Sequence, residues 1–98
     1  MGSKEFIQFA KELIVKYFNE RADKSDKNGH ITTDDVFVVW SSKILQNSKA
    51  LLSTTVPDGM YYEITLNGSK KEVYLDAYKK FENVRLDADG NPVKENAK

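Results

Sequence analysis

The residues that most resemble a site for chemistry lie in the polar stretch KSDKNGHITTDD, from Lys24 to Asp35. Set against the calcium-loop pattern D-x-[DN]-x-[DN]-G-x₅-E, this stretch supplies Asp26, Asn28 and Gly29 at matching positions and Asp35 at the last ligand position. Calcium needs carboxylate oxygens around it, but the first ligand position holds the cation of Lys24. We therefore interpret the match as an Asn-Gly turn in a polar loop, and we predict neither a metal nor another cofactor.

His30 is the only histidine, and the chain has no cysteine. A zinc site would need two or three carboxylates to converge on His30, and the nearby aspartates all lie in the same polar loop. No nucleophile-elbow pattern supports a Ser/His/Asp triad, and the glycines form no phosphate-binding loop. The sequence therefore predicts a protein that is not an enzyme.

A second set of candidate residues is aromatic and basic, and it falls on one surface of a predicted sheet. Strand alternation places Tyr61, Tyr74 and, if the last strand is long enough, Tyr78 on the same face. Lysines stand at the strand ends: Lys70, Lys71, Lys79 and Lys80. Such a surface can stack the bases of single-stranded nucleic acid, or it can anchor a protein partner through tyrosine hot spots. The third interpretation is that these tyrosines only stabilise a two-sided sheet.

Composition favours a protein partner, or self-association, over nucleic acid. Lys plus Arg and Asp plus Glu number 15 each among 98 residues, so no net field attracts nucleic acid or an anionic membrane. No apolar run approaches the roughly 18 residues of a membrane span, and the N-terminal residues lack the apolar core of a signal peptide. The absence of cysteine fits a cytosolic protein. Whether the first three residues are native stays open.

Residues 4–21 carry the pattern of an amphipathic helix. The apolar residues that recur at the spacing of one helical face are Phe6, Ile7, Ala10, Leu13, Ile14, Tyr17 and Phe18. Ser3 is the expected N-cap. A stripe this apolar needs a sheet or a partner to cover it.

The segment 36–45 has two interpretations. Threonines and aspartates just before it are typical of a helix start, and a helix would place Val36, Val39 and Trp40 on one face. A succession of β-branched and aromatic residues favours a strand instead. We predict the strand, with Val38 and Trp40 facing the core.

Short polar breaks divide the remainder of the region 31–80 into further strands. Asn47-Ser48 predicts a turn into a strand over 49–56, and Pro57-Asp58-Gly59 predicts a turn into a strand over 60–66. Asn67-Gly68 is the preferred pair for a two-residue hairpin loop.

Two registers of that last hairpin remain open. A two-residue loop sets Tyr61 opposite Tyr74 but also Glu63 opposite Glu72, which is unfavourable. A four-residue loop keeps the same faces and separates the two glutamates. Residues 77–82 either continue the strand or form a turn of helix. Residues 87–98 are polar, and we predict a disordered tail after a single domain over 1–86.

The amino-acid sequence of residues 40–83 resembles a family of short proteins of unknown function encoded by phages and prophages of Gram-positive bacteria. The resemblance is carried by KILQN at 43–47, KALLST at 49–54, DGMYYE at 58–63 and YLDAYKK at 74–80. It covers residues 32–83 and, more loosely, the preceding helix. It brings no catalytic residue with it. It implies a small phage product in the cytoplasm of a bacterial host.

We predict an α+β fold, in which one N-terminal amphipathic helix packs on a roughly four-stranded antiparallel β-meander. The predicted core is Phe6, Ala10, Leu13, Ile14, Tyr17, Val38, Trp40, Leu52, Tyr62, Ile64, Val73 and Leu75. The predicted function is that of a non-enzymatic protein-interaction module that binds a host or phage protein or itself. The alternative is single-stranded nucleic-acid binding through the tyrosine and lysine face.

Overall fold

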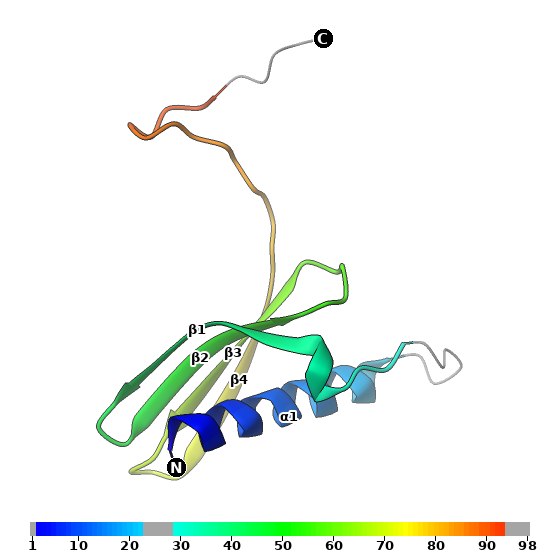
Figure 1. Ribbon diagram of the computed structural model, residues 1–98, viewed down its shortest axis with the longest axis vertical. Coiled ribbons are helices and arrows are strands. Elements are labelled where there is room, and N and C mark those ends of the chain that lie inside the picture. Colours follow the sequence, from blue (N-terminus) through cyan, green and yellow to red (C-terminus); the bar gives the residue numbers. More distant parts are fainter. Residues whose placement is uncertain (1, 23–28, 94–98) are drawn as a thin grey trace.

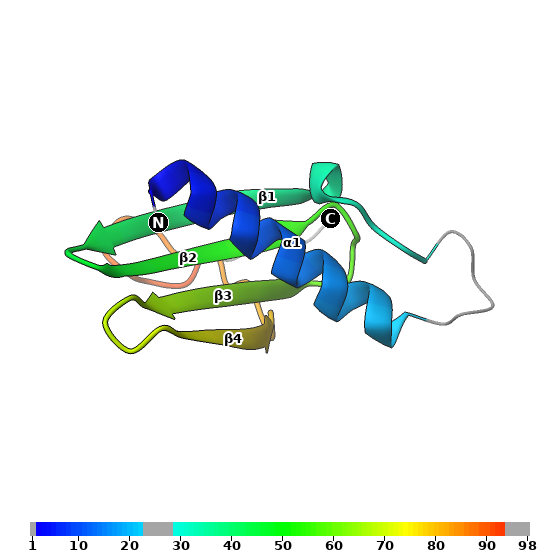
Figure 2. The same cartoon turned by 90° about the horizontal axis from the view of Figure 1, so that it is seen from below.

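The computed structural model describes residues 2–22 and 29–93 and consists of one helix packed on one sheet. The elements are α1 (Ser3–Arg21), a 3₁₀ turn η1 (Thr33–Asp35), β1 (Val36–Ile44), β2 (Asn47–Thr54), β3 (Met60–Asn67) and β4 (Glu72–Lys79). The strands lie in the order β1-β2-β3-β4, and each pair is antiparallel. Helix α1 covers one face of the sheet only (Figures 1 and 2). This arrangement confirms the predicted α+β fold.

Helix α1 is held by its apolar stripe. Phe6, Ala10 and Ile14 recur every four residues, so they share one face and are buried against the sheet. The expected N-cap at Ser3 is wrong: the helix already includes Ser3, and Gly2 is the N-cap with no side-chain hydrogen bond. Within the described residues, no helix has the length and apolarity that a membrane span requires.

The core lies between α1 and the covered face of the sheet. Most of the predicted core residues are buried there or packed against it: Phe6, Ala10, Leu13, Ile14, Tyr17, Val38, Leu52, Tyr62, Ile64 and Leu75. The core also contains three residues that the sequence pattern missed, Ile31, Val36 and Ala50. Ile31 is fixed by the side-chain amide of Asn19, which donates to its carbonyl at 3.0 Å and accepts from its N–H at 2.9 Å.

The predicted strand over 36–45 is confirmed as β1, but the predicted core position of Trp40 is wrong. Val38 pairs with Leu52, and Trp40 pairs with the adjacent Leu51, so Val39 is an extra residue in β1. Such a β-bulge shifts the side-chain alternation by one residue. Trp40 therefore lies on the face away from α1 and is 42% exposed.

Val73 is the second core prediction that fails, since it is 38% exposed. Helix α1 crosses the sheet diagonally and leaves the corner at the β3–β4 turn uncovered (Figure 2). Val73 pairs with Leu66, which is the second residue pair from that turn. Its side chain is therefore on the helix side of the sheet but beyond the reach of the helix.

The turns differ from the sequence expectation at two places. Asn47-Ser48 is not a turn, because Ile44 pairs with Asn47 and the loop between them is Leu45-Gln46. Between β3 and β4, Asn67 pairs with Glu72, so the loop has four residues and the two-residue alternative is excluded. Gly68 donates its N–H to the carbonyl of Gln46 at 3.1 Å, which joins the two turns.

The chain after β4 leaves the sheet. β4 ends at Lys79, so residues 77–82 form no helix, and Lys80 N–H donates to Gly59 O at 2.8 Å. Residues 80–93, which we call the C-terminal arm, then extend away on the side opposite α1 (Figure 1). A turn at Asp87 closes near the end of the arm, where Val93 N–H donates to Arg85 O at 3.1 Å. The domain limit at residue 86 and the disorder of the tail stay predictions.

Candidate interaction surface

The polar loop offers no metal centre in the part of the chain that the structure describes. Asp26 and Asn28 lie outside the described residues. The carboxylate of Asp35 accepts the N–H of Thr32 at 2.9 Å and the hydroxyl of Thr55 at 3.3 Å, so it fastens η1 to the end of β2. No group of three or more His, Asp or Glu side chains in the described ranges could hold an ion.

The face of the sheet that α1 leaves uncovered, which we call the open face, collects the large aromatic side chains. Pairing and strand alternation place seven apolar or aromatic residues on it: Phe37, Trp40, Ile44, Leu51, Tyr61, Tyr74 and Tyr78. Four of them are between 42% and 53% exposed, namely Trp40, Phe37, Tyr78 and Tyr74. Each strand of the sheet contributes at least one residue to this apolar and aromatic set on the open face.

The three tyrosines proposed from the sequence share the open face, but their pairing differs from the two-residue hairpin. Tyr61 stands opposite Tyr78, and Tyr74 stands opposite Thr65. On its other side Tyr61 pairs with Ser53, which pairs with Phe37. One register row of the open face therefore runs across all four strands and carries three aromatic rings.

The proposed lysines do not join the tyrosines. Lys70 and Lys71 lie in the β3–β4 turn, and Lys79 stands opposite Met60, which puts it on the helix side. The open face holds Lys49 instead, and its Nζ lies 3.7 Å from Oε1 of Glu63. The basic half of the predicted site is thus dispersed.

Carboxylates outnumber lysines among the strand residues of the open face. Glu63 stands opposite Asp76, and Glu72 lies on the same face near the turn. The Glu63 carboxylate, followed by that of Asp76, raises the pKa of the Tyr78 phenol. A hydrogen bond to Glu72 raises the pKa of Tyr74. Both tyrosines are therefore neutral donors at pH 7, in a weakly negative environment.

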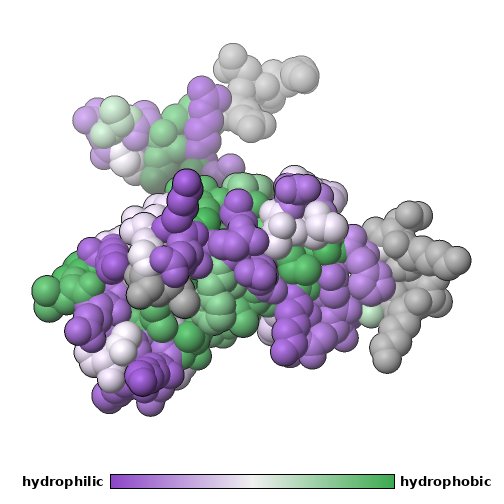
Figure 3. Space-filling view, turned by 60° about the horizontal axis from the view of Figure 1, so that its bottom comes forward, coloured by the Kyte–Doolittle hydropathy of each residue, from purple (hydrophilic) through white to green (hydrophobic). Residues whose placement is uncertain are grey.

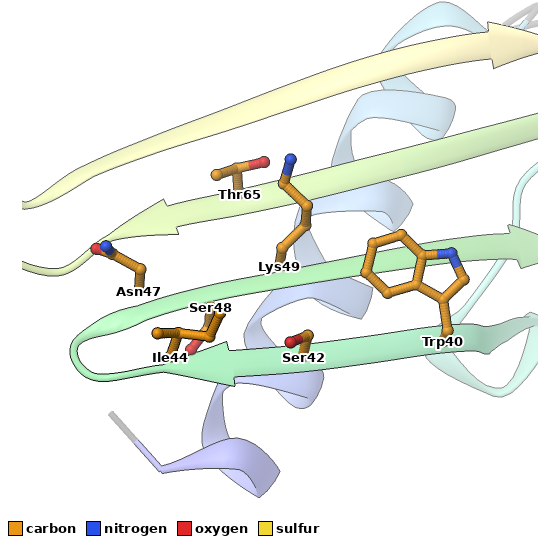
Figure 4. A pocket seen from close by; sticks show the side chains of 7 residues that line it. All are labelled: Trp40, Ser42, Ile44, Asn47, Ser48, Lys49 and Thr65. Carbon is orange, nitrogen blue, oxygen red and sulfur yellow. The ribbon is translucent and has the colours of Figure 1, made fainter.

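A groove of about 520 Å³ hollows the open face at the end nearest the β1–β2 turn. The side chains that line it are those of Trp40, Ser42, Ile44, Asn47, Ser48, Lys49 and Thr65 (Figure 4). The indole of Trp40 lies at one end of the groove, and Ile44 and Asn47 lie at the other end. This lining combines apolar walls with hydroxyl, amide and ammonium groups. Such a combination can hold a small group by apolar contact and orient it by hydrogen bonds.

Sequence reasoning missed Phe37 and Trp40 as surface residues. Regular alternation put Trp40 with Val36 and Val38, and only the extra residue at Val39 separates them. The available signal was that the run FVVW is apolar on both faces of the strand. When only one face of a sheet is covered, a strand that is apolar on both faces indicates that its second face also makes a contact.

Comparison with known proteins gives a family but no activity. A family model described as a family of unknown function (DUF6275) matches residues 7–88, which include most of α1, all four strands and the first part of the arm. No curated protein and no solved structure matches the chain. The match spans most of the chain, so the protein belongs to this family of unknown function.

Proposed function

We propose that the protein is a non-enzymatic interaction module and that the open face is the surface that recognises a protein partner. The observation that carries this proposal is the exposure of the aromatic side chains: 42% at Trp40, 48% at Phe37, 51% at Tyr78 and 53% at Tyr74. Contiguous apolar surface on one face is typical of interaction sites. Trp and Tyr are the side chains most enriched among interface hot spots.

The layout of the open face supports the same role. Its aromatic row is flanked by Lys49 and by the carboxylates of Glu63 and Asp76. A partner that buries the rings can meet these charges at the edge of the contact, where they select the partner more than they add affinity. The groove beside Trp40 offers a place for one inserted side chain.

Single-stranded nucleic acid is the second candidate, favoured only by tyrosines on an open sheet. Bases can stack on such rings, but the carboxylates of Glu63, Glu72 and Asp76 repel the phosphates that supply most of the affinity. We expect no retention on an immobilised oligonucleotide at low salt. Retention that weakens as salt is raised, and that is lost in Tyr78→Ser, would favour nucleic acid over protein.

We also propose that the protein is a phage or prophage product that acts in the cytoplasm of its bacterial host. This part rests on the sequence resemblance and on the absence of cysteine. The position of the gene tests it: a location among phage genes is expected, and a location among unrelated chromosomal genes in all relatives would contradict it.

Capture of a partner from a bacterial lysate, compared between matched variants, tests the interaction role. We expect Trp40→Ser to lose the partner that the unmodified chain retains. Val73→Ser is the control, because Val73 is similarly exposed, 38% against 42% for Trp40, but lies on the helix side. Circular dichroism verifies that both variants fold. Equal retention by all three proteins would contradict the proposal.

A further inference from the structure

The C-terminal arm carries apolar side chains that its own domain does not cover. Phe81 is 98% exposed, Val84 55% and Leu86 50%. In the space-filling view the hydrophobic surface of the arm stands apart from the body of the protein (Figure 3). A single chain in water thus exposes two apolar surfaces, the arm and the open face, and both lie on the side of the sheet away from α1 (Figure 1).

The arm is directed away from its own open face. The hydrogen bond from Lys80 N–H to Gly59 O, 2.8 Å long, ties the start of the arm to the β2–β3 turn. The far end is closed by Asp87, whose carboxylate accepts the N–H groups of Asp89 and Asn91 at 2.9 Å each. An arm held in this way presents Phe81, Val84 and Leu86 to a neighbouring molecule.

We propose that the arm of one copy packs across the open face of a second copy, so that two chains form a reciprocal dimer. This inference rests on the proposed role of the open face and names its partner. A twofold arrangement covers both arms and both faces at once and leaves neither apolar surface free. The chain has a formal net charge of zero, so two copies do not repel each other.

The lengths of the two surfaces match. Five residue steps of extended chain, from Phe81 to Leu86, span about 17 Å. Four strands span three interstrand distances, about 14 Å. The apolar part of the arm is therefore long enough to cross the whole sheet. In an extended arm Val84 and Leu86 share the side that lies on the sheet, and Phe81 reaches only its edge.

The charges of the two surfaces are complementary. Glu63 and Asp76 face each other on the open face, and such a like-charge pair is unfavourable. Lys49 lies 3.7 Å from Glu63 and compensates one carboxylate. Arg85 is on the arm between Val84 and Leu86, and its guanidinium has no ion-pair partner among the described residues. Arg85 alternates with these two residues, but its long side chain can reach around the docked arm toward the acidic pair.

Sedimentation of the full chain tests the proposal. We expect a species of 22.4 kDa, twice the 11.2 kDa of one chain. The double variant Phe81→Ser/Leu86→Ser changes only exposed side chains, so it retains the fold, and because each dimer would lose four apolar side chains we expect its dimer to weaken by roughly 10,000-fold or more. Val73→Ser is the control and should remain dimeric. A chain that stays monomeric at high concentration, or a dimer that the double variant leaves intact, would overturn the proposal.

Mixing variants shows whether the arm of one copy meets the face of the other. The arm variant Phe81→Ser/Leu86→Ser keeps an intact face, and Trp40→Ser/Tyr78→Ser keeps an intact arm. Each alone should be monomeric, whereas an equimolar mixture should regain a dimer held by one of the two contacts. No dimer in the mixture would contradict arm exchange. The capture experiment with Trp40→Ser gives a separate result. If the unmodified chain is monomeric but retains a lysate partner that Trp40→Ser loses, arm exchange is refuted and the proposed function stands.

Discussion

Leu45 occupies a backbone conformation that its side chain disfavours. Its φ is 57°, in the left-handed region, and its side chain is 88% exposed at the tip of the β1–β2 hairpin. For a non-glycine residue this conformation costs about 1–2 kcal/mol. No turn statistic would place leucine there, which is one reason why the sequence suggested a turn at Asn47-Ser48.

Replacement of Leu45 with glycine should stabilise the protein. Glycine adopts a positive φ without steric cost, and we expect the free energy of unfolding in urea to rise by about 0.5–1 kcal/mol after its larger entropy loss is subtracted. Gln46→Gly is the control, because φ of Gln46 is not positive, so this variant relieves no strain; it keeps the entropy loss and also removes the exposed hydrogen bond from Ser69 Oγ to Gln46 Oε1. If both variants are destabilised equally, the strain at Leu45 is refuted.

Gly68 is required by a close approach rather than by its φ. A Cβ built there would lie 2.2 Å from the carbonyl oxygen of Gln46 in the neighbouring turn. We expect Gly68→Ala to lower the free energy of unfolding by about 1–3 kcal/mol, as overpacking does elsewhere. In Gly2→Ala the new Cβ would have 3.4 Å to its nearest neighbour, so this variant should lose only the preference of the helix N-cap for glycine over alanine, about 0.5 kcal/mol. Equal stability of the two variants would contradict the contact.

The titration of Tyr78 reports the charges around it. Glu63 and then Asp76 raise its pKa, so we expect Glu63→Gln to move the Tyr78 pKa down toward 10, measured by NMR of the ring carbons. Glu72→Gln should instead lower the pKa of Tyr74, which it raises through a hydrogen bond. An unchanged Tyr78 pKa in Glu63→Gln would show that solvent screens the Tyr78 phenol from the charge of Glu63.

The raised tyrosine pKa values also give the sign of the pH dependence of stability. Burial, followed by the charge of Asp58, raises the pKa of Tyr62 as well. Below pH 10 these phenols are protonated in the folded and the unfolded state alike. Above it the unfolded chain loses protons that the folded protein keeps, so the free energy of unfolding falls as the pH rises from 10 through the raised values.

At the scale of elements, α1 and the sheet depend on each other. Ile14 is fully buried between them, and Ile14→Ala should cost about 2–5 kcal/mol of unfolding free energy. Glu12 is on the exposed side of α1, so Glu12→Ala should change little. A small effect of Ile14→Ala in urea unfolding would mean that the helix contributes little to the core.

The elements themselves could be predicted because their signals are local. The stripe of α1, the alternation of β3 and the proline-glycine turn before it all lie within a few residues of sequence. The bulge at Val39 and the contact of Gly68 with Gln46 depend on strand pairing, which local patterns do not encode. The candidate surface was found in part for the same reason: alternation placed its tyrosines correctly, whereas Trp40 depended on the bulge.

At the scale of the whole molecule, the protein has one covered and one uncovered sheet face. Most globular domains bury a sheet that is apolar on both faces beneath a second layer. Here the second layer is absent from the described residues, and a 14-residue arm with exposed apolar side chains extends from the end of β4. In the proposed dimer, the arm of the second copy is the missing layer.

The fluorescence of Trp40 tests this claim most directly, because it is the only tryptophan and it lies on the open face. If the arm of a second copy covers that face, the emission maximum should move to shorter wavelength as the protein concentration is raised through the monomer–dimer range. The variant Phe81→Ser/Leu86→Ser should keep the emission of an exposed indole over the same range. Emission that does not change with concentration, or that shifts equally in the variant, would contradict the account.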